Sequence, residues 1–290
     1  MRYLRPTALV AASLVLLLAT DGTGVSAEAT APVAVAVPRI RALALPDRAG
    51  PPKVRGAFSG LAFDVCTAPP LSTMQTWWDQ SSYSAIGIYT SGSHRACAQS
   101  RLTADWVRQA RAMGWRFLPV HAGSQAPCLD PARRPQRIDP AHAAEQGRAE
   151  ADEAVRGLQA LGFGPGNPVY VDMEAYPRND TACAQAVVDF ALGWTAGLHD
   201  RGYTSGFYSS FASGISDLAA AAWAGSSPLP DAVWYAKWDG HADTKAPAPL
   251  GGDLWVYHQR AHQYQGNVKD THGGVTLTVD RDYVDGPAAF

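Results

Sequence analysis

From about residue 56 onward, short apolar runs alternate along the chain with segments whose apolar residues recur at helical spacing. A short apolar run bounded by turn residues is typical of a buried strand, and recurrence every three or four residues is typical of an amphipathic helix. The runs predict strands at 60–66, 83–89, 115–121, 169–174, 203–209, 232–238, 254–258 and 275–279. The helical segments between them are 71–80, 103–114, 139–162, 181–199 and 217–223.

The ends of these helical segments carry the residue types that start and stop helices. Thr103 is a good N-cap for its segment, and Gly114 follows the last helical turn. Asp139 followed by Pro140 predicts the first turn of the long Ala- and Glu-rich helix, which Gly162 ends.

Alternating strands and helices predict a parallel sheet with right-handed crossovers. Eight candidate strands in one domain favour an α/β fold with a single closed (β/α)8 barrel of the TIM type, and an open doubly wound sheet is the alternative. Connections shorten after about residue 238, so we expect helices to be missing in the last third. One barrel over residues 56–290 fits the usual length of about 250 residues.

Two carboxylates end the fourth predicted strand. Residues i and i+2 of a strand point to the same face, about 7 Å apart, so Asp172 and Glu174 emerge together on the face of Tyr170 and Tyr176. Acidic residues are rarely buried without partners, and barrel active sites lie at this end of the strands. The pattern favours a catalytic mouth; a structural pair that holds a loop through backbone N–H groups is the alternative.

Further acids follow other predicted strands. Asp64 lies near the end of the first strand, and Asp280 and Asp282 follow the eighth. In a closed barrel the first and eighth strands are neighbours and the fourth lies across the mouth, so these carboxylates would flank a cleft. Carboxylates on both sides of a bound sugar are what glycoside hydrolysis needs.

The first 55 residues have a different character. Arg2 and Arg5 precede an apolar run over 9–19 and small residues at 25–27, which is the pattern of a secretory signal peptide. The run is shorter than the roughly 20 residues of a membrane helix. We expect a signal peptide at 1–27, with an uncleaved anchor as the alternative, and a Pro- and Ala-rich linker at 28–55. The protein is then secreted or cell-wall associated, without a stable membrane anchor.

Charge and motifs narrow the function. A formal net charge of −2 argues against nucleic-acid binding, which usually needs a basic surface. The sequence has no H-E-x-x-H motif, and its histidines and acids have no recognisable metal-site spacing. It has no G-x-S-x-G motif, so an α/β-hydrolase nucleophile is missing. The 9 Trp and 11 Tyr suit a large core and also a protein that stacks on sugar rings.

Four cysteines follow the first four predicted strands: Cys66, Cys97, Cys128 and Cys183. An even number in an oxidising compartment predicts two disulfides, and the absence of C-x-x-C spacing argues against a zinc or thioredoxin-like site. Four cysteines allow three connectivities. Because loops after neighbouring strands lie close together, we predict Cys66–Cys97 and Cys128–Cys183.

Six motifs in a fixed order resemble those of a known family. They are Ala62-Phe63-Asp64, Asp172-Met173-Glu174, Gly206-Phe207-Tyr208-Ser209, Trp234-Tyr235-Ala236-Lys237-Trp238, His262-Gln263-Tyr264 and Val279-Asp280-Arg281-Asp282. Together they resemble the domain of unknown function 1906 (Rv2525c-like) family of secreted bacterial proteins. Its glycoside-hydrolase-like domain is related to the family 25 lysozymes. The resemblance covers essentially residues 56–290.

The resemblance implies cleavage of the β-1,4 link between N-acetylmuramic acid and N-acetylglucosamine in peptidoglycan, without metal or organic cofactor. It implies that Glu174 is the general acid and that Asp172 orients the substrate's N-acetyl group or stabilises positive charge. Asp64 and Asp280 would complete the acidic floor, with Asp282 as a substitute for Asp280. A carboxylic acid beside other carboxylates holds its proton more strongly, which suits a proton donor near neutral pH.

Several side chains are candidates for sugar binding, with core packing as the alternative for the aromatic ones. We expect the substrate-binding residues to be Tyr89, Tyr176, Tyr208, Trp238, Tyr264 and Asp282. Lys237 departs from the lysozyme pattern: it either points outward or points inward, where it would pair with Asp172 or bind an anionic sugar. The histidines at 121, 258 and 262 are expected to be structural.

We expect the protein to be a monomer and to bind a cell-wall polysaccharide. Two classes of function agree with these expectations. The first is a glycoside hydrolase. The second is a non-catalytic glycan-binding or envelope-maintenance protein that uses the same cleft.

Overall fold

The computed structural model describes residues 56–130, 132 and 136–290. The signal peptide predicted at 1–27 and the linker predicted at 28–55 lie outside these residues. Among the helices that are described, none has the length and apolar character to cross a bilayer.

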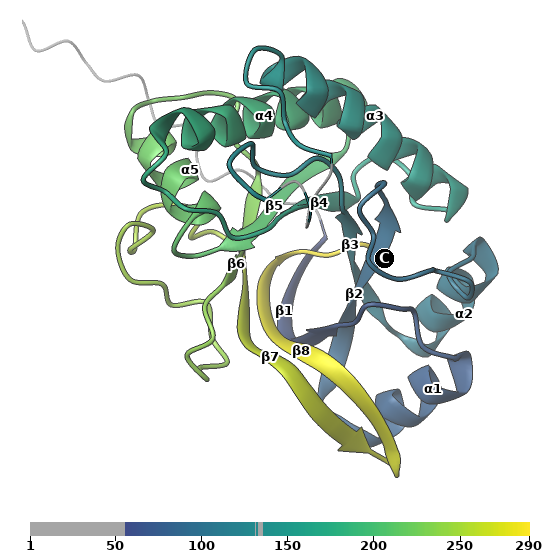
Figure 1. The fold of residues 1–290 in the computed structure, drawn as a ribbon. Helices are drawn as coiled ribbons and strands as arrows, with labels where there is room; N and C mark the ends of the chain where they lie inside the picture. Colours follow the sequence, from purple (N-terminus) through teal and green to yellow (C-terminus); the bar gives the residue numbers. More distant parts are fainter. Residues whose placement is uncertain (1–55, 131, 133–135) are drawn as a thin grey trace, which may run out of the picture. The chain divides into compact units, whose positions relative to one another are not determined.

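Helices and strands alternate along the described residues as far as β6, and the two remaining elements are strands (Figure 1). In chain order the elements are β1 (Ala57–Asp64), α1 (Leu71–Gln80), β2 (Tyr83–Ser91), α2 (Ala104–Met113), β3 (Arg116–His121), α3 (Ala143–Ala160), β4 (Pro168–Met173), α4 (Thr181–Asp200), β5 (Thr204–Ser210), α5 (Gly214–Trp223), β6 (Ala232–Ala236), β7 (Arg260–His272) and β8 (Val275–Pro287).

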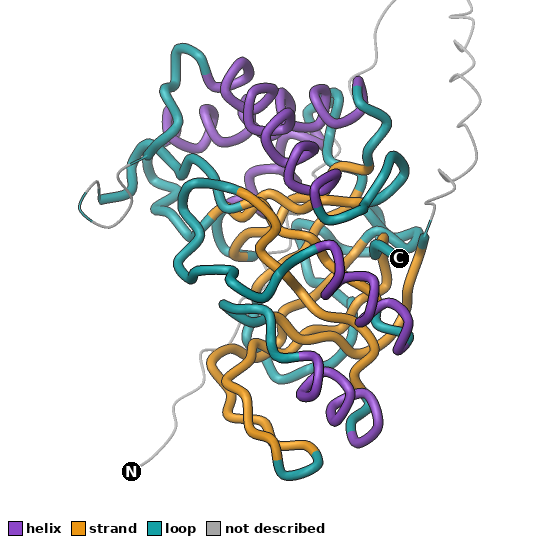
Figure 2. Tube along the Cα trace, turned by 90° about the vertical axis from the view of Figure 1, so that its right-hand side faces the viewer, coloured by secondary structure: helices purple, strands orange, loops and turns teal. Residues whose placement is uncertain are grey.

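The strands close into a barrel in sequence order, with β8 paired to β1, and the helices pack on its outside (Figure 2). The TIM-type fold class is confirmed, and so is the expected loss of helices in the last third, because the described residues have no helix after α5. However, β8 is antiparallel to both neighbours, which corrects the expectation of an all-parallel sheet. Only Gly273 and Gly274 join β7 to β8, and so short a connection reverses the chain.

The strand predicted at 254–258 is wrong. Trp255 and His258 have φ angles of 52° and 54°, which regular strands do not contain. Trp255 is instead the buried anchor of a loop, with its indole N–H donating to the Pro230 carbonyl at 2.7 Å. The seventh strand begins at Arg260, whose buried guanidinium donates to carbonyl oxygens of the same loop, including that of Gly251 at 2.8 Å.

The β7–β8 hairpin extends beyond the barrel and lies against α1, as the yellow ribbon in Figure 1 shows. The indole N–H of Trp77 on α1 donates to the Val275 carbonyl at 3.1 Å. At the start of β2, the Tyr83 hydroxyl donates to Asp270 Oδ2 at 2.9 Å. These two hydrogen bonds tie the hairpin to α1 and to the start of β2.

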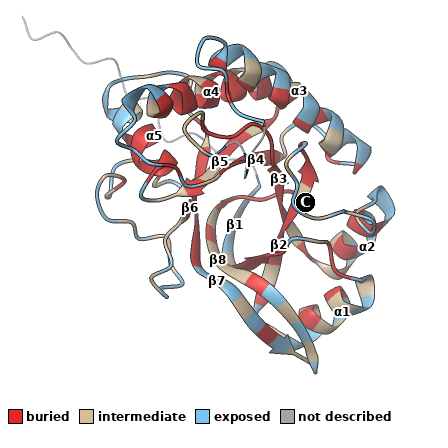
Figure 3. Ribbon diagram, viewed as in Figure 1, coloured by how far each residue is buried: buried red, intermediate tan, exposed pale blue. Residues whose placement is uncertain are grey.

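Apolar side chains fill two layers, one between the barrel and the helices and one inside the barrel. Buried positions follow the inner faces of the helices and the strands (Figure 3). Inside the barrel, the rings of Tyr170 and Trp234 meet edge to face at 5.7 Å between centroids. A Cβ at Gly206 would lie 2.3 Å from the Tyr170 ring, so this position on β5 needs glycine to leave room for it.

The helix ends test the cap predictions. Thr103 caps α2 as predicted, because its hydroxyl oxygen accepts from the Trp106 N–H at 3.1 Å. The long helix α3 begins at Ala143, about one turn later than the signal at Asp139 predicts. The Asp139 carboxylate accepts from the Ala141 N–H at 3.0 Å and thereby closes a turn that precedes the helix.

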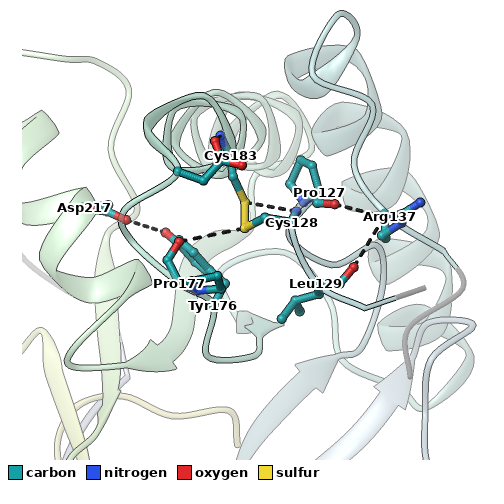
Figure 4. Close-up of a disulfide and its surroundings, with 9 residues drawn as sticks. Pro127, Cys128, Leu129, Arg137, Tyr176, Pro177, Cys183 and Asp217 are labelled. Carbon is teal, nitrogen blue, oxygen red and sulfur yellow. Dashed lines mark hydrogen bonds between the residues drawn. A yellow bond between two sulfur atoms is a disulfide. The ribbon is translucent and has the colours of Figure 1, made fainter. Parts of the chain in front are cut away.

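Both predicted disulfides are confirmed. Cys66–Cys97 joins the loops after β1 and β2, and Cys128–Cys183 joins the loop after β3 to the first turn of α4 (Figure 4). Their Cα–Cα distances of 5.6 and 5.7 Å lie in the usual range. Both cross-links hold loops at the carboxyl ends of the strands, the end at which barrel active sites lie.

Candidate active site

A cavity of about 270 Å³ opens at the carboxyl ends of the strands. Its walls come from the ends of β1, β2 and β4 and from the β7–β8 hairpin. The four acids predicted as catalytic line it together: Asp64, Asp172, Glu174 and Asp280. Side chains that are more than 100 residues apart in sequence therefore meet around one small space.

The first wall is the end of β4, where strand parity brings both Asp172 and Glu174 to the cavity as expected. Gln125, in the loop after β3, holds this strand end. Its Nε2 donates to the Asp172 carbonyl at 2.7 Å, and its Oε1 accepts from the Glu174 N–H at 2.9 Å. This buried side-chain amide continues the β3–β4 ladder past the end of β3, so the backbone that carries the two acids is fixed.

The second wall is formed by β1, β7 and β8. Asp64 ends β1 and lies opposite Asp280 in the antiparallel ladder with β8. Gln263 of β7 links the two acids: its Nε2 donates to Asp64 Oδ2 at 2.9 Å and to Asp280 Oδ2 at 3.3 Å. Position 87 on β2 needs glycine, because a Cβ there would lie 2.5 Å from the Asp64 Cβ.

Asp282 lies one inward-facing position deeper on β8 and has no exposed surface. Its Oδ1 accepts from the Trp234 indole N–H at 2.9 Å, and its carboxyl group hydrogen-bonds that of Asp64. Two carboxyl groups form such a bond only when one of them holds a proton. Burial, followed by the charge of Asp64, raises the pKa of Asp282 well above its usual range, so Asp282 is the protonated donor.

The two acids that line this wall also hold protons more strongly than usual. Burial raises the pKa of Asp64 to about 7, and the charge of Asp280 adds to this, while hydrogen bonds from Gln263 and Asp282 oppose it. Burial also raises the pKa of Asp280, against the hydrogen bond from the Asn267 N–H at 2.5 Å. Asn267 has a φ of 56° in an irregular part of β7, which directs its N–H to Asp280.

One of the aromatic residues expected to bind sugar lines the cavity, and two more are linked through Gln263 to Asp64 and Asp280, which line it. Tyr89 lines it. The Tyr208 hydroxyl and the Trp238 indole N–H donate to Gln263 Oε1 at 3.1 and 3.0 Å. Trp238 is 60% exposed and offers an open ring to solvent. Burial and then nearby carboxylates raise the pKa of Tyr89 and of Tyr208 above the usual range, so both hydroxyls stay protonated.

Three other expected binding residues lie away from the cavity, which corrects their predicted placement. Tyr176 is buried, and its hydroxyl donates to Asp217 Oδ2 at 2.7 Å (Figure 4). The chain leaves the strand after Met173, so alternation no longer applies at Tyr176. Tyr264 follows the inward-facing Gln263 on β7 and therefore faces outward. Asp282 has no surface that a ligand could touch.

Comparison with known proteins gives the family. The family described as Rv2525c-like, glycoside hydrolase-like domain matches residues 75–284, which is well over half of the chain. The chain belongs to this family. The match confirms the resemblance seen in the motifs, although it begins after β1 and so leaves Asp64 outside. A search of curated proteins gives no match.

Solved structures resemble this family member in fold. An uncharacterized protein from B. stearothermophilus is 18% identical with a TM-score of 0.52, over 77% of this chain and 95% of that one. The Cpl-1 endolysin, solved with a peptidoglycan analogue, is 15% identical with a TM-score of 0.42, over 80% and 55%. A GH18 chitinase from Pseudoalteromonas aurantia is 12% identical with a TM-score of 0.43, over 69% and 78%.

In this member of the Rv2525c-like family, the three histidines considered from sequence do not line the cavity. His121 is buried between Ser91 and Glu150, and both ring nitrogens of the buried His262 lie within 2.8 Å of backbone carbonyl oxygens. His258 pairs with a carboxylate at the surface. Lys237 forms an ion pair with Asp239 and does not line the cavity, which favours the outward alternative.

Sequence reasoning missed several residues of the site: Gln125, Gln263, Asn267 and His94, the last of which lines the cavity. Gln263 lies in one of the motifs that carry the family resemblance, and that was its available signal. Gln125 lies in a loop without any pattern. No group of three or more His, Cys, Asp or Glu side chains in the described part of the chain is arranged to hold a metal ion.

Proposed function

We propose that this protein is a secreted glycoside hydrolase that cleaves a β-1,4 link in bacterial cell-wall glycan, with Glu174 as general acid. The observation that carries the proposal is that Asp64, Asp172, Glu174 and Asp280 line one cavity at the carboxyl ends of the barrel strands. Membership of a glycoside hydrolase-like family supports the same chemistry. Two disulfides are compatible with an oxidising compartment outside the cytoplasm.

The β4 wall supplies the reacting groups in this proposal. Glu174 donates a proton to the glycosidic oxygen as the bond from that oxygen to the anomeric carbon breaks. Asp172 orients the N-acetyl group of the sugar or stabilises the positive charge that develops at the anomeric carbon. Water adds to that carbon and releases a proton, which restores Glu174 for the next cycle. Gln125 supports both roles because it fixes the backbone of the two acids.

The second wall supplies an electrostatic floor, and the rim supplies binding. An oxocarbenium-like transition state is stabilised by nearby negative charge, which Asp64 and Asp280 provide when they are ionised. The exposed ring of Trp238 stacks on a sugar next to the cleavage point, and Tyr89 and Tyr208 present neutral hydroxyls to its polar edge.

The test is release of reducing ends from purified peptidoglycan by the wild type and by Glu174→Gln. We expect the substitution to lower the rate about 1,000-fold, within the range of removing a general acid, without a change in melting temperature. Glu153→Gln, an exposed change on α3, is the matched control and should keep full activity. Equal, background release by wild type and Glu174→Gln, with retained binding to the glycan, would instead identify a non-catalytic glycan-binding protein.

A further inference from the structure

Gln263 contacts two acids and two aromatic residues of the cleft through its side-chain amide. Its Nε2 faces Asp64 and Asp280, and its Oε1 faces the Tyr208 hydroxyl and the Trp238 indole N–H. An amide nitrogen carries two hydrogens and an amide oxygen accepts two hydrogen bonds, so this orientation satisfies all four partners. The flipped amide would place N–H groups against two donors and the oxygen against two carboxylates.

We propose that Gln263 is a positioning residue that couples the Asp64–Asp280 acid pair to a sugar platform formed by Trp238. The proposal rests on the proposed function, because it assigns both parts to one glycan-binding cleft. Gln263 is only 2% exposed, so it acts through the groups that it holds.

The acid pair needs the Gln263 amide because its two carboxyl groups lie opposite each other, with that of Asp64 buried and that of Asp280 half-buried. Hydrogen bonds from one NH2 group to both carboxylates favour their ionised forms and oppose the effect of burial. Other titratable groups face the pair from β8, β5, β2 and β4 and from the loop after β2: Asp282, Tyr208, Tyr89, Asp172, Glu174 and His94. The acids among these groups add negative charge near the pair when they are ionised, which opposes the ionisation of Asp64 and Asp280. The two hydrogen bonds from the neutral Gln263 amide favour that ionisation.

The Trp238 ring needs the hydrogen bond to Gln263 because this side chain is exposed and lies just after the end of β6. Its ring is held at two places. The N–H donates to Gln263 at 3.0 Å, and one ring carbon lies so near Gly266 that a Cβ there would be 2.1 Å away. A ring fixed before the sugar arrives loses less conformational entropy on binding than a free one. The same amide therefore fixes the platform and the acids relative to each other.

The first experiment uses Gln263→Glu, which keeps the shape of the side chain and removes the NH2 group. Thermal unfolding is measured at pH 5 and pH 8. We expect a change of under about 2 °C at pH 5, where the new carboxyl group is protonated and can still donate one hydrogen bond. At pH 8 three carboxylates face each other, and we expect a loss of about 5 °C or more.

The matched control is Gln265→Glu, at an exposed position on the same strand. Gln265 Oε1 accepts from Arg281 Nη1 at 3.2 Å, and a carboxylate keeps that contact, so neither pH should show a clear change. An equal loss at pH 5 and pH 8 in Gln263→Glu would overturn the coupling to the acid pair, since it would mark a merely structural side chain.

The second experiment uses Gln263→Leu to release the platform. The emission of Trp238 is obtained as the difference between spectra recorded with Trp238 and with Trp238→Phe, in the wild type and in Gln263→Leu. In Gln263→Leu this difference spectrum should shift by a few nanometres, and its quenching by acrylamide should become about twofold stronger. Binding of soluble peptidoglycan fragments, measured by calorimetry, should weaken about tenfold. In the Trp238→Phe background the same substitution should weaken binding only about twofold.

Unchanged Trp238 emission, or equal effects of Gln263→Leu in both backgrounds, would overturn the coupling to the platform. The unfolding and emission measurements need no glycan cleavage. A wild type that releases no reducing ends but passes these two tests would therefore refute the proposed hydrolase activity and keep the coupling.

Discussion

The two walls of the cavity are built differently although both present pairs of carboxylates. On the β4 wall, Asp172 and Glu174 are held through their backbone by Gln125. On the other wall, Gln263 donates to the side-chain carboxyl groups of both Asp64 and Asp280, and Asp282 hydrogen-bonds that of Asp64. On the β4 wall the hydrogen bonds thus fix the backbone from which Asp172 and Glu174 project. On the other wall they act on the carboxyl groups and so alter how readily the acids ionise.

This difference separates two roles that are easily confused in an acidic cleft. A carboxyl group that transfers protons needs a defined position relative to the substrate. A carboxyl group whose oxygens already accept hydrogen bonds from buried donors is better suited to hold a fixed charge or a fixed proton. The hydrogen bonds on the carboxyl groups of Asp64 and Asp280 therefore suit this pair to the part of the floor in the proposed mechanism.

The largest effect on stability is expected from removing the support of the β4 wall. Gln125→Leu leaves the Asp172 carbonyl and the Glu174 N–H buried without their partner, which should cost about 2–5 kcal/mol of unfolding free energy. Hydrolysis should fall with it, because both acids move. Chemical denaturation checks the value. Gln75→Leu on the exposed face of α1 is the control, and an equally small effect of both changes would mean that Gln125 supports nothing.

A smaller, pH-dependent effect is expected at the second wall. Folded Asp64 keeps its proton up to about pH 7, whereas the unfolded chain loses it near pH 4. The folded state therefore binds more protons in this window, and its stability should fall as the pH rises from about 5 to 8. Asp64→Asn should reduce this slope and raise the free energy of unfolding at pH 8 by about 2 kcal/mol. Denaturation curves at both pH values measure it.

Asp253→Asn, an exposed change in a loop, controls for the loss of one negative charge. It should leave the slope of stability against pH unchanged. Asp280 and Asp282 also have raised pKa values, so part of the slope should persist in Asp64→Asn. A wild type that is equally stable at pH 5 and pH 8 would contradict the description of this wall.

The smallest effect is expected at Trp238, which Gln263 links to the second wall. Trp238→Phe keeps an aromatic face and loses the N–H that donates to Gln263. One hydrogen bond of about 1 kcal/mol predicts roughly fivefold weaker glycan binding. Titration with soluble peptidoglycan fragments measures this. Trp223→Phe, at a Trp that is 61% exposed at the end of α5, should bind as the wild type does.

Local patterns carried much of the fold and part of the site. The barrel followed from strands that alternate with helices, and the cavity position of Asp172 and Glu174 followed from strand parity and the rule that sites lie at strand ends. The pattern failed at residues 254–258, because an apolar run does not distinguish a strand from a loop that buries one aromatic side chain, here Trp255. It failed at Tyr176, because parity ends with the strand.

The sequence by itself therefore determined the fold class, the disulfide pairing by loop order and the four acids of the mouth, since each depends on local periodicity or on the order of elements. Only the tertiary structure decided that Asp282 is sealed beneath Asp64, that β8 runs antiparallel, and that Gln125 and Gln263 hold the two walls. These depend on contacts between side chains far apart in the chain, such as the 199 residues that separate Asp64 from Gln263. No local pattern encodes which donors a buried carboxyl group will meet.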